Sequence, residues 1–338
     1  MESVKRRNYL IDNLKVVLIF FVVFGHVIEY YIKDNSMLRI VYVFIYIFHM
    51  PLFIFISGYL SKNFYRMKRK AIRNLLIPYI IFNTIWYIAV YIGTKENMFS
   101  ILLPGWTLWY LLSLFFWRMS LKYIVKFRHI LLFSFFIGAV VGLVPSVGSI
   151  LSISRTIVFL PFFLLGYYTK EEHLIRIKNF NKLLSIICIL LFLFFAIYIV
   201  KINLFDYKFL YYSYSFSALG VSLIRGVIFR LLLYVSSIIF GICVISIVSD
   251  KKQVYSSLGK ATMNIYVFHI YLVMLVYFFI PKWNIGIVQN ILILLSPFLI
   301  IFILSRKNVN KFYDGIFYPV NVGIDTGKSS YKKYKKQE

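Results

Sequence analysis

Long apolar runs recur along the whole chain, and they constrain its fold more than any other feature. A helix that crosses the hydrocarbon core of a bilayer needs about 20 mostly apolar residues. Hydrophobic residues make up 61% of the 338 residues and charged residues only 15%, whereas soluble domains are roughly half apolar and about a quarter charged. The sequence therefore predicts an all-α, polytopic membrane protein.

Ten of these runs are candidate membrane helices, and the fourth and fifth are the shortest. They cover residues 14–31, 40–60, 75–92, 106–121, 130–145, 151–168, 183–200, 228–248, 262–280 and 287–304. Lys and Arg crowd the cytoplasmic loops of membrane proteins, and with the N-terminus inside, 29 of the 38 basic residues fall on the cytoplasmic side. The sequence predicts about ten transmembrane helices with a cytoplasmic N-terminus and a cytoplasmic C-terminus.

The net charge of +26 does not indicate nucleic acid, because the basic residues stand in short clusters between apolar runs rather than on one surface. Cys188 and Cys243 both lie inside apolar runs, where a cysteine is typically a small hydrophobe. No disulfide framework, metal site or permanently bound cofactor is expected. A single transmembrane domain over 1–305 and a basic cytoplasmic tail over 306–338 are predicted.

The first run contains IDNLKVVLIFFVVFGH (residues 11–26), with Lys15 near its start and His26 at its end. Eleven residues of helix return to within about 20° of the starting face and advance roughly 16 Å, so both side chains lie on one stripe. Glu29 follows His26 by three residues and is placed to hydrogen-bond its ring and fix its tautomer. An ionisable group within the membrane is a functional candidate; the alternative is that His26 and Glu29 sit in the outer interface.

The second run contains FHMPLFIFISGYL (residues 48–60), in which His49 stands two residues before Pro51. Proline frees a backbone carbonyl and opens a helix, while Ser57 and the glycine after it let a neighbour or ligand approach closely. His269, in IYVFHIYLV, is a third histidine at membrane depth. A three-histidine metal site is disfavoured, because no pair has ligand spacing.

Three further features sit near the predicted membrane surfaces. Arg69 and Arg73 are four residues apart at a helix entrance and can present adjacent forks to a phosphorylated ligand, although topology alone also explains such charges. Arg155 lies on the outer side, where the positive-inside rule disfavours a basic residue. We therefore expect it to pair with another group of the protein, in a structural role, or with the substrate. Residues 201–227 form the longest outer segment and are expected to be an ordered or partly re-entrant loop. Their tyrosines either stack on sugars or form an interfacial belt.

Six motifs occur in the order found in a known family, across the chain up to about residue 305. They are IDNLKVVLIFFVVFGH, FHMPLFIFISGYL, RKAIRNLLIPY, LWYLLSLFFWR (residues 108–118), SRTIVFLPFFLLGYY (residues 154–168) and SLGKATMNIYVFHIYLV (residues 257–273). Together they resemble the membrane-bound acyltransferase-3 proteins, especially the branch similar to fucose 4-O-acetylases. The second motif is the most specific of the six.

The resemblance implies ten helices in one acyltransferase-3-like domain over 1–305, located in the cell (plasma) membrane. It implies an O-acetyltransferase that moves an acyl group from a cytoplasmic donor such as acetyl-CoA to a sugar hydroxyl of a cell-surface or exported polysaccharide. Acetyl-CoA is then a donor substrate, and the partners are a cell-envelope glycan or lipid-linked glycan precursor and the membrane lipids. The oligomeric state stays open.

The family's first-helix pattern places a basic residue eleven positions before a histidine, which corresponds to Lys15 and His26. Where Arg is common, this chain has Lys, a point charge in place of a bidentate fork. The expected catalytic residues are His26, as general base or transient acyl carrier, and His49; the donor-binding residues are Lys15, Arg69, Arg73 and Ser57; and the residues that orient the base or the acceptor are Glu29, Trp109, Arg155 and His269. A lipid-linked sugar flippase or polysaccharide exporter is the alternative function, since it also combines many helices with intramembrane basic residues.

Overall fold

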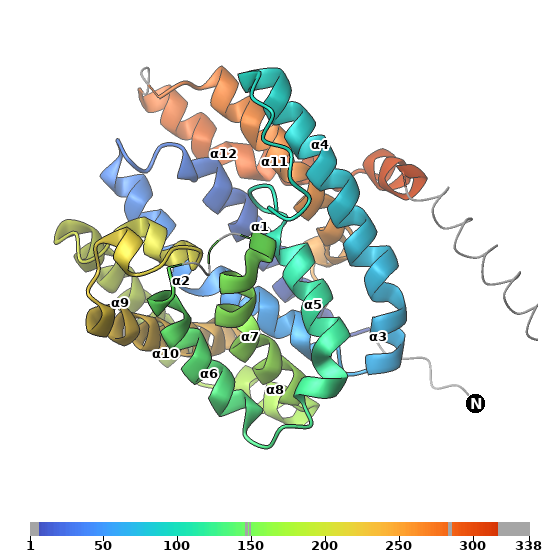
Figure 1. The fold of residues 1–338 in the computed structure, drawn as a ribbon, viewed down its shortest axis with the longest axis vertical. Helices are drawn as coiled ribbons and strands as arrows, with labels where there is room; N and C mark the ends of the chain where they lie inside the picture. Colours follow the sequence, from blue (N-terminus) through green and yellow to red (C-terminus); the bar gives the residue numbers. More distant parts are fainter. Residues whose placement is uncertain (1–6, 146–147, 149, 283–285, 317–338) are drawn as a thin grey trace, which may run out of the picture.

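A computed structural model describes residues 7–145, 148, 150–282 and 286–316, and every regular element in these ranges is helical (Figure 1). The α-helices are α1 (Tyr9–Glu29), α2 (Ser36–Tyr59), α3 (Phe64–Ala71), α4 (Ile77–Thr94), α5 (Trp109–Ile124), α6 (Ile130–Val140), α7 (Ile153–Tyr168), α8 (Glu171–Lys178), α9 (Lys182–Lys201), α10 (Leu223–Ile247), α11 (Thr262–Phe279) and α12 (Ile287–Leu304). The shorter elements are the π-helix η1 (Ile72–Leu76) and the 3₁₀-helices η2 (Val141–Leu143), η3 (Ile150–Ser152), η4 (Tyr207–Tyr211), η5 (Ser217–Leu219) and η6 (Val254–Lys260). The predicted all-α class is confirmed.

Eight helices in the described part of the chain are long and apolar enough to cross a membrane. One of them joins α3, η1 and α4 into a continuous stretch, Phe64–Thr94. The predicted runs 106–121 and 130–145 form α5, with 16 residues, and α6, with 11. At 1.5 Å per residue α5 extends about 24 Å and α6 about 16 Å, short of the roughly 30 Å hydrocarbon core. The predicted number of ten spans is therefore not confirmed, and the side on which each terminus lies stays a prediction.

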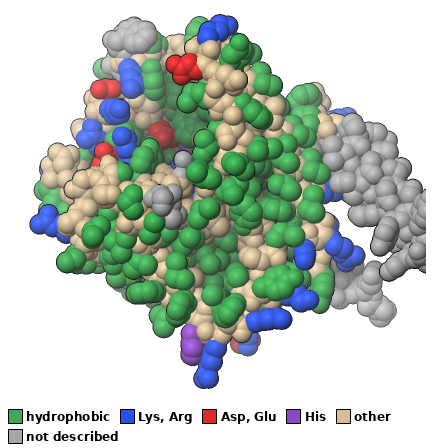
Figure 2. Space-filling view, in the orientation of Figure 1, with side chains coloured by type: hydrophobic (Ala, Val, Ile, Leu, Met, Phe, Trp, Pro, Cys, Tyr) green, Lys and Arg blue, Asp and Glu red, His purple; other side chains and the backbone are tan. Residues whose placement is uncertain are grey.

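The helices differ widely in how far they are buried, and this defines the inside and outside of the bundle. In their most apolar windows, 61% of the residues of α1 and of α2 are buried, against 17% for α9. Large apolar side chains of α9 and α12 face outward, and Figure 2 shows apolar side chains over most of the visible face, with Lys and Arg gathered near its edges. Such an apolar exterior is stable in lipid and unfavourable in water, so the structure is that of a multi-pass membrane protein.

Asparagines set where several helices begin. Asn8, Asn35, Asn63 and Asn181 precede α1, α2, α3 and α9, and each side-chain oxygen accepts a hydrogen bond from the backbone N–H three residues later. The first N–H groups of a helix have no intrahelical partner, so this capping stabilises the start. The cap at Asn8 fixes the register of α1 and thereby the depth of its functional candidates.

The closest helix contact joins α2 to α7. A Cβ atom added at Gly58 would lie 1.9 Å from the carbonyl oxygen of Phe163, and one added at Gly166 would lie 1.8 Å from the carbonyl oxygen of Phe55. The two backbones therefore touch directly, which only glycine permits, as in other membrane helix pairs. This contact explains the Ser-Gly pair in the second motif: its glycine is needed for packing.

Pro51 interrupts the hydrogen-bond ladder of α2 in the middle of the bundle. Proline has no N–H, so the carbonyl of Ile47, four residues earlier, loses its usual donor. Ser237 of α10 donates its hydroxyl to this carbonyl at 2.6 Å. The freed carbonyl is thus satisfied from a neighbouring helix, which is the requirement for a proline inside a membrane.

The predicted outer segment 201–227 is ordered around one buried phenylalanine. Phe216 is fully buried, its N–H donates to the carbonyl of Gly142 at 2.8 Å, and its ring fills the space where Gly142 and Gly226 lack a Cβ. Arg230, 1% exposed, lies against the same region, with its guanidinium over the rings of Phe209, Tyr212 and Phe216. Ring packing therefore holds a segment that has little regular secondary structure.

The described start of the predicted tail packs against the bundle. Residues 307–316 are helical, Asn264 of α11 donates a hydrogen bond to Asn310, and the ring of Tyr313 lies near those of Phe82 and Phe268. The remaining residues of the predicted tail, 317–338, lie outside the described part of the chain.

Replacement of Gly58 by alanine should destabilise the bundle. The added methyl group would overlap the Phe163 carbonyl, and overpacking of this kind costs about 1–3 kcal/mol. Gly93→Ala is the matched control, because nothing lies within 4 Å of a Cβ added there. Thermal denaturation in detergent, followed by size exclusion, should show a lower midpoint temperature for Gly58→Ala than for wild type. The midpoint temperature of Gly93→Ala should not be lowered. Equal midpoints for Gly58→Ala and wild type would contradict the packing interpretation.

Candidate active site

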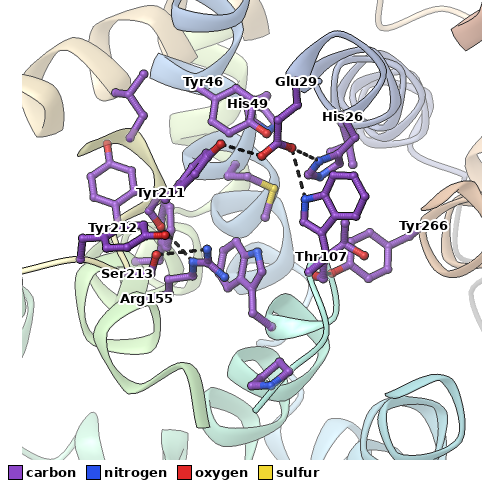
Figure 3. A pocket seen from close by; sticks show the side chains of 18 residues that line it. His26, Glu29, Tyr46, His49, Thr107, Arg155, Tyr211, Tyr212, Ser213 and Tyr266 are labelled. Atoms are coloured by element: carbon purple, nitrogen blue, oxygen red, sulfur yellow. Dashed lines mark hydrogen bonds and ion pairs between the residues drawn. The ribbon is translucent and has the colours of Figure 1, made fainter. Parts of the chain in front are cut away.

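A cavity of about 320 Å³ lies among α1, α2, α5, α7, α11 and the connecting segments 104–108 and 210–214. Aromatic and polar side chains dominate its wall, which consists of Val22, His26, Glu29, Tyr46, His49, Met50, Pro104, Trp106, Thr107, Trp109, Arg155, Phe159, Leu210, Tyr211, Tyr212, Ser213, Tyr214 and Tyr266. We call it the His26 cavity (Figure 3). Its size suits a small ligand or part of a larger one.

Glu29 is the centre of a hydrogen-bond network in this cavity. Its Oε1 accepts from the hydroxyl of Tyr211 at 2.6 Å, and its Oε2 accepts from the indole N–H of Trp106 at 3.2 Å and pairs with Nδ1 of His26 at 3.0 Å (Figure 3). Burial, and then the carboxylate itself, raise the pKa of Tyr211 well above its usual range, so its hydroxyl stays a donor. Three donors compensate the cost of a half-buried carboxylate.

The contact with Glu29 determines how the His26 ring can act. In the neutral ring, Nδ1 donates its hydrogen to Glu29, which leaves the lone pair on Nε2. The His26 side chain is 14% exposed, so the ring is neither sealed off nor in bulk solvent. A histidine oriented by a carboxylate in this way has the arrangement of a general base or nucleophile. The predicted contact between His26 and Glu29 is thus present in the structure.

His49 and His269 are both held through Nδ1 by backbone carbonyls of their own helices. His49 bonds to the carbonyl of Ile45 at 2.8 Å, and His269 to that of Tyr266 at 2.7 Å. His49 lines the His26 cavity, whereas His269 lies behind its wall with its ring 5.4 Å from that of His26. In both rings the lone pair falls on Nε2. Nε2 of His269 is buried without a hydrogen-bond partner among the described residues.

Arg155 presents a positive charge to the His26 cavity. Its Nε donates to the carbonyl of Tyr211 at 2.9 Å, one terminal nitrogen donates to the hydroxyl of Ser213 at 3.3 Å, and the guanidinium lies 5.2 Å from the ring centroid of Trp109. None of the salt bridges among the described residues includes Arg155. Its charge is therefore only partly compensated and remains available to an anionic or polarised group.

A second cavity, of about 260 Å³, contains Lys15, and we call it the Lys15 cavity. Its wall consists of Lys15, Phe53, Ile56, Ser57, Leu60, Met67, Asn74, Leu75, Tyr110, Leu114, Arg118, Thr262, Met263 and Tyr266. Lys15 is already engaged, because Nζ pairs with Asp12 at 2.8 Å and donates to the carbonyl of Gly259 at 2.9 Å. The Ser57 hydroxyl shares a 2.6 Å hydrogen bond with that of Tyr110.

The structure separates the predicted donor-binding residues into two groups. Lys15 and Ser57 line the Lys15 cavity, whereas Arg69 in α3 and Arg73 in η1 are absent from its wall. Arg118 of α5 also lines the Lys15 cavity. Its Nε donates to the hydroxyl of Ser61 at 3.2 Å, and it has no ion pair among the described residues.

Sequence reasoning overlooked Arg118, Trp106, Tyr211 and Tyr266. A signal for Arg118 was present, since Tyr110, Leu114 and Arg118 are spaced by four residues and a helix puts such residues on one face. The positive-inside rule alone already explains an arginine at this position, so the sequence did not single out Arg118 as a cavity residue. No local signal marks Trp106 or Tyr211, because each meets Glu29 from a distant part of the chain.

The bundle and its cavities define a class of protein: a multi-pass membrane protein with a histidine–carboxylate pair inside the bundle, suited to proton-coupled group transfer. In the described part of the chain, no group of three or more His, Cys, Asp or Glu side chains is placed to hold a metal ion. The two cavities bring together two histidines, a carboxylate and two arginines: His26, His49, Glu29 and Arg155 in one, and Arg118 in the other.

Comparison with known proteins supplies the family. The model of an acyltransferase domain matches residues 8–306, nearly the whole chain, and the protein belongs to the acyltransferase-3 family. The predicted class of enzyme, an acyltransferase for groups other than aminoacyl groups, is the class of this family. The narrower resemblance to fucose 4-O-acetylases stays a prediction.

A named relative is the nodulation protein NolL of Sinorhizobium fredii (strain NBRC 101917 / NGR234). It is 31% identical over 205 residues, which cover 54% of this chain and 55% of NolL. The match thus spans about half the length of that relative. No solved structure matches the chain.

Replacement of Glu29 by glutamine should impair acyl transfer severely. The amide can donate to Nδ1 of His26, which would move the ring hydrogen to Nε2 and remove the lone pair needed there; a wrong tautomer and lost base catalysis cost roughly 10²–10⁴-fold in rate. Transfer from a thioester donor in isolated membranes measures the effect. Glu96→Gln, at an exposed position after α4, is the control. A wild-type rate for Glu29→Gln would exclude the carboxylate from the reaction.

Proposed function

We propose that the protein is a membrane O-acetyltransferase of the plasma membrane, which moves an acetyl group from cytoplasmic acetyl-CoA to a sugar hydroxyl of a cell-surface or exported polysaccharide. The observation that carries this proposal is the His26–Glu29 pair in a cavity of an acyltransferase-3 chain. A hydroxyl is a poor nucleophile until a base removes its proton. The pair supplies such a base inside the bundle.

The reaction follows from the free lone pair on His26. Nε2 accepts the proton of the sugar hydroxyl while the hydroxyl oxygen forms a bond to the thioester carbon. The carbon–sulfur bond then breaks, and the departing thiolate takes the proton from His26 to give the CoA thiol and the acetylated sugar. The same lone pair also suits His26 to carry the acetyl group transiently, and both routes depend on the contact with Glu29.

Arg155 and His49 complete the reaction centre in this proposal. The guanidinium of Arg155 stabilises the negative charge that develops on the carbonyl oxygen, because a fixed positive charge acts strongly where water is largely excluded. His49, with its lone pair on Nε2, provides a second proton acceptor in the same cavity. His269 backs the His26 ring and holds its position.

The Lys15 cavity suits the donor. Lys15 and Arg118 bring positive charge to a cavity that is otherwise mostly apolar, and Ser57 with Tyr110 adds hydroxyl groups. Phosphates and the polar pantetheine arm match these groups, with Arg118 supplying the planar fork that Lys15 lacks. In this arrangement Arg69 and Arg73 act outside the cavity, along the path by which an anionic nucleotide approaches.

Aromatic rings on the other side of the reaction centre suit a sugar acceptor. Tyr46, Trp109 and Tyr214 line the His26 cavity, and their apolar faces and polar edges can contact the C–H and O–H groups of a sugar ring. The partner is accordingly a cell-envelope glycan or a lipid-linked glycan precursor. Membrane lipids cover the apolar exterior.

Replacement of His26 by alanine should abolish O-acetylation, since the proton acceptor and the acyl-carrying nitrogen are lost together. Comparing proton NMR spectra of surface glycan from cells with wild-type and variant protein measures the acetyl methyl signals. His129→Ala is the control, because His129 is exposed at the start of α6 and lines neither cavity. Unchanged acetylation at normal expression of His26→Ala would overturn the proposal.

Glycan retained inside knockout cells, with normal acetylation of what escapes, would indicate the flippase or exporter alternative.

Replacement of Arg118 by glutamine should weaken donor binding. A hydrogen bond to a charged group is worth about 1.5–3 kcal/mol, which corresponds to roughly 10–100-fold in KM for acetyl-CoA. Arg69→Gln, the competing sequence-based assignment, should raise KM less, because Arg69 is exposed outside the cavity. Steady-state kinetics with both variants ranks the two arginines, and a larger effect of Arg69→Gln would reverse this assignment.

A further inference from the structure

The His26 cavity and the Lys15 cavity share one wall residue, Tyr266 of α11. Its side chain is 4% exposed, so the ring fills the wall between them. Figure 3 shows it at the margin of the His26 cavity beside Thr107. The acyl-transfer steps proposed above assign no role to this tyrosine.

The two cavities follow each other along the same helices. On α1, Lys15 lines one and His26 the other, and the eleven residues between these positions span roughly 16 Å. On α2, which runs in the opposite direction, His49 lines the His26 cavity and Ser57 the Lys15 cavity, about 12 Å apart. The same order on both helices places the two cavities one after the other across the bundle, with Tyr266 between them, and we call the two cavities together the passage.

The ring of Tyr266 is held by contacts that can be broken without unfolding a helix. Its hydroxyl donates to the carbonyl of Thr107, and its ring meets that of Tyr110 edge-on at 5.3 Å between centroids. The hydroxyl of Thr107 is buried and has no hydrogen-bond partner among the described residues. The wall therefore contains an unused polar group at the point where Tyr266 closes it.

We propose that Tyr266 is the gate between the donor and acceptor halves of the passage, a conclusion that rests on the proposed function. Acetyl-CoA seated in the Lys15 cavity reaches His26 only when the ring swings aside and the thioester enters the His26 cavity. With the ring closed, water in the His26 cavity stays away from the thioester. The closed ring thus limits hydrolysis of the thioester while no transfer takes place.

The loss of the ring should uncouple the reaction. Without acceptor, water then attacks the thioester: its oxygen bonds to the acetyl carbon, the carbon–sulfur bond breaks, and acetate, a proton and the CoA thiol are released. Purified full-length Tyr266→Ala should release thiol from acetyl-CoA about tenfold faster than wild type, the effect of admitting water to a closed site. Its size-exclusion profile in detergent should match that of wild type, which reports that the variant is folded.

Enlarging the ring tests the same gate in the opposite direction. Tyr266→Trp should lower glycan acetylation about tenfold by obstructing the passage, a loss of roughly 1.4 kcal/mol of transition-state stabilisation, while its size-exclusion profile stays that of wild type. Tyr271→Ala and Tyr271→Trp are matched controls on α11, since Tyr271 lines neither cavity. Both should behave as wild type in thiol release and acetylation.

Thiol labelling tests the gate without measuring activity, and it uses Tyr266→Phe, the most conservative of the three substitutions. Met50→Cys places a thiol in the His26 cavity, in a background where Cys188 and Cys243 are replaced by alanine. In sealed vesicles, a charged methanethiosulfonate is added from the Lys15 side. It should label this thiol several-fold faster in the Tyr266→Phe variant than in the same background with Tyr266, since the hydroxyl that holds the ring is gone.

The outcomes separate the two proposals. Wild-type protein that neither binds CoA nor transfers acetyl groups would overturn the proposed function, and the gate with it. An active wild type with unchanged thiol release in Tyr266→Ala, unchanged acetylation in Tyr266→Trp and equal labelling in Tyr266→Phe would overturn the gate alone.

Discussion

The half-buried carboxylate of Glu29 imposes the constraint on which the site depends. An ionised carboxylate away from water is costly unless several donors compensate it. The donors come from α1, from the connection before α5 and from the outer segment, through His26, Trp106 and Tyr211. One charge therefore holds together three parts of the chain that are far apart in sequence, and the cavity lies where they meet.

Positive charges inside the bundle are accommodated differently. The chain has 38 basic residues but only 12 acidic ones, together with 28 tyrosines and 35 phenylalanines. Arg230 is accordingly packed over aromatic rings. Arg155 contacts one aromatic ring and donates hydrogen bonds to a backbone carbonyl and to a serine hydroxyl. Cation–π contacts gain strength when water is excluded. They hold the Arg155 guanidinium in place although none of the ion pairs among the described residues includes it.

The sequence predicted the features that arise within one helix and missed those that depend on the assembled bundle. Lys15, His26 and Glu29 could be placed relative to one another because helical spacing alone relates them. Trp106 and Tyr211 reach the His26 cavity through long-range packing, which no local pattern encodes. The helical spacing that places Arg118 beside Tyr110 was visible in the sequence, but the positive-inside rule explained the same arginine. The all-α membrane class followed from the apolar runs, whereas the number of spans did not, because an apolar run shows that a segment avoids water and leaves open whether its helix extends across the bilayer.

The bond from Ser237 to the carbonyl that Pro51 frees has an evolutionary consequence. Loss of the serine hydroxyl alone would strand a buried carbonyl, and replacement of the proline alone would supply that carbonyl with a second donor. Neither change is neutral by itself, while both together restore one donor for one acceptor. The two positions, 186 residues apart in sequence, are therefore expected to covary among descendants of this chain, and their joint identity records whether the proline in α2 and its compensating bond from α10 have been kept together.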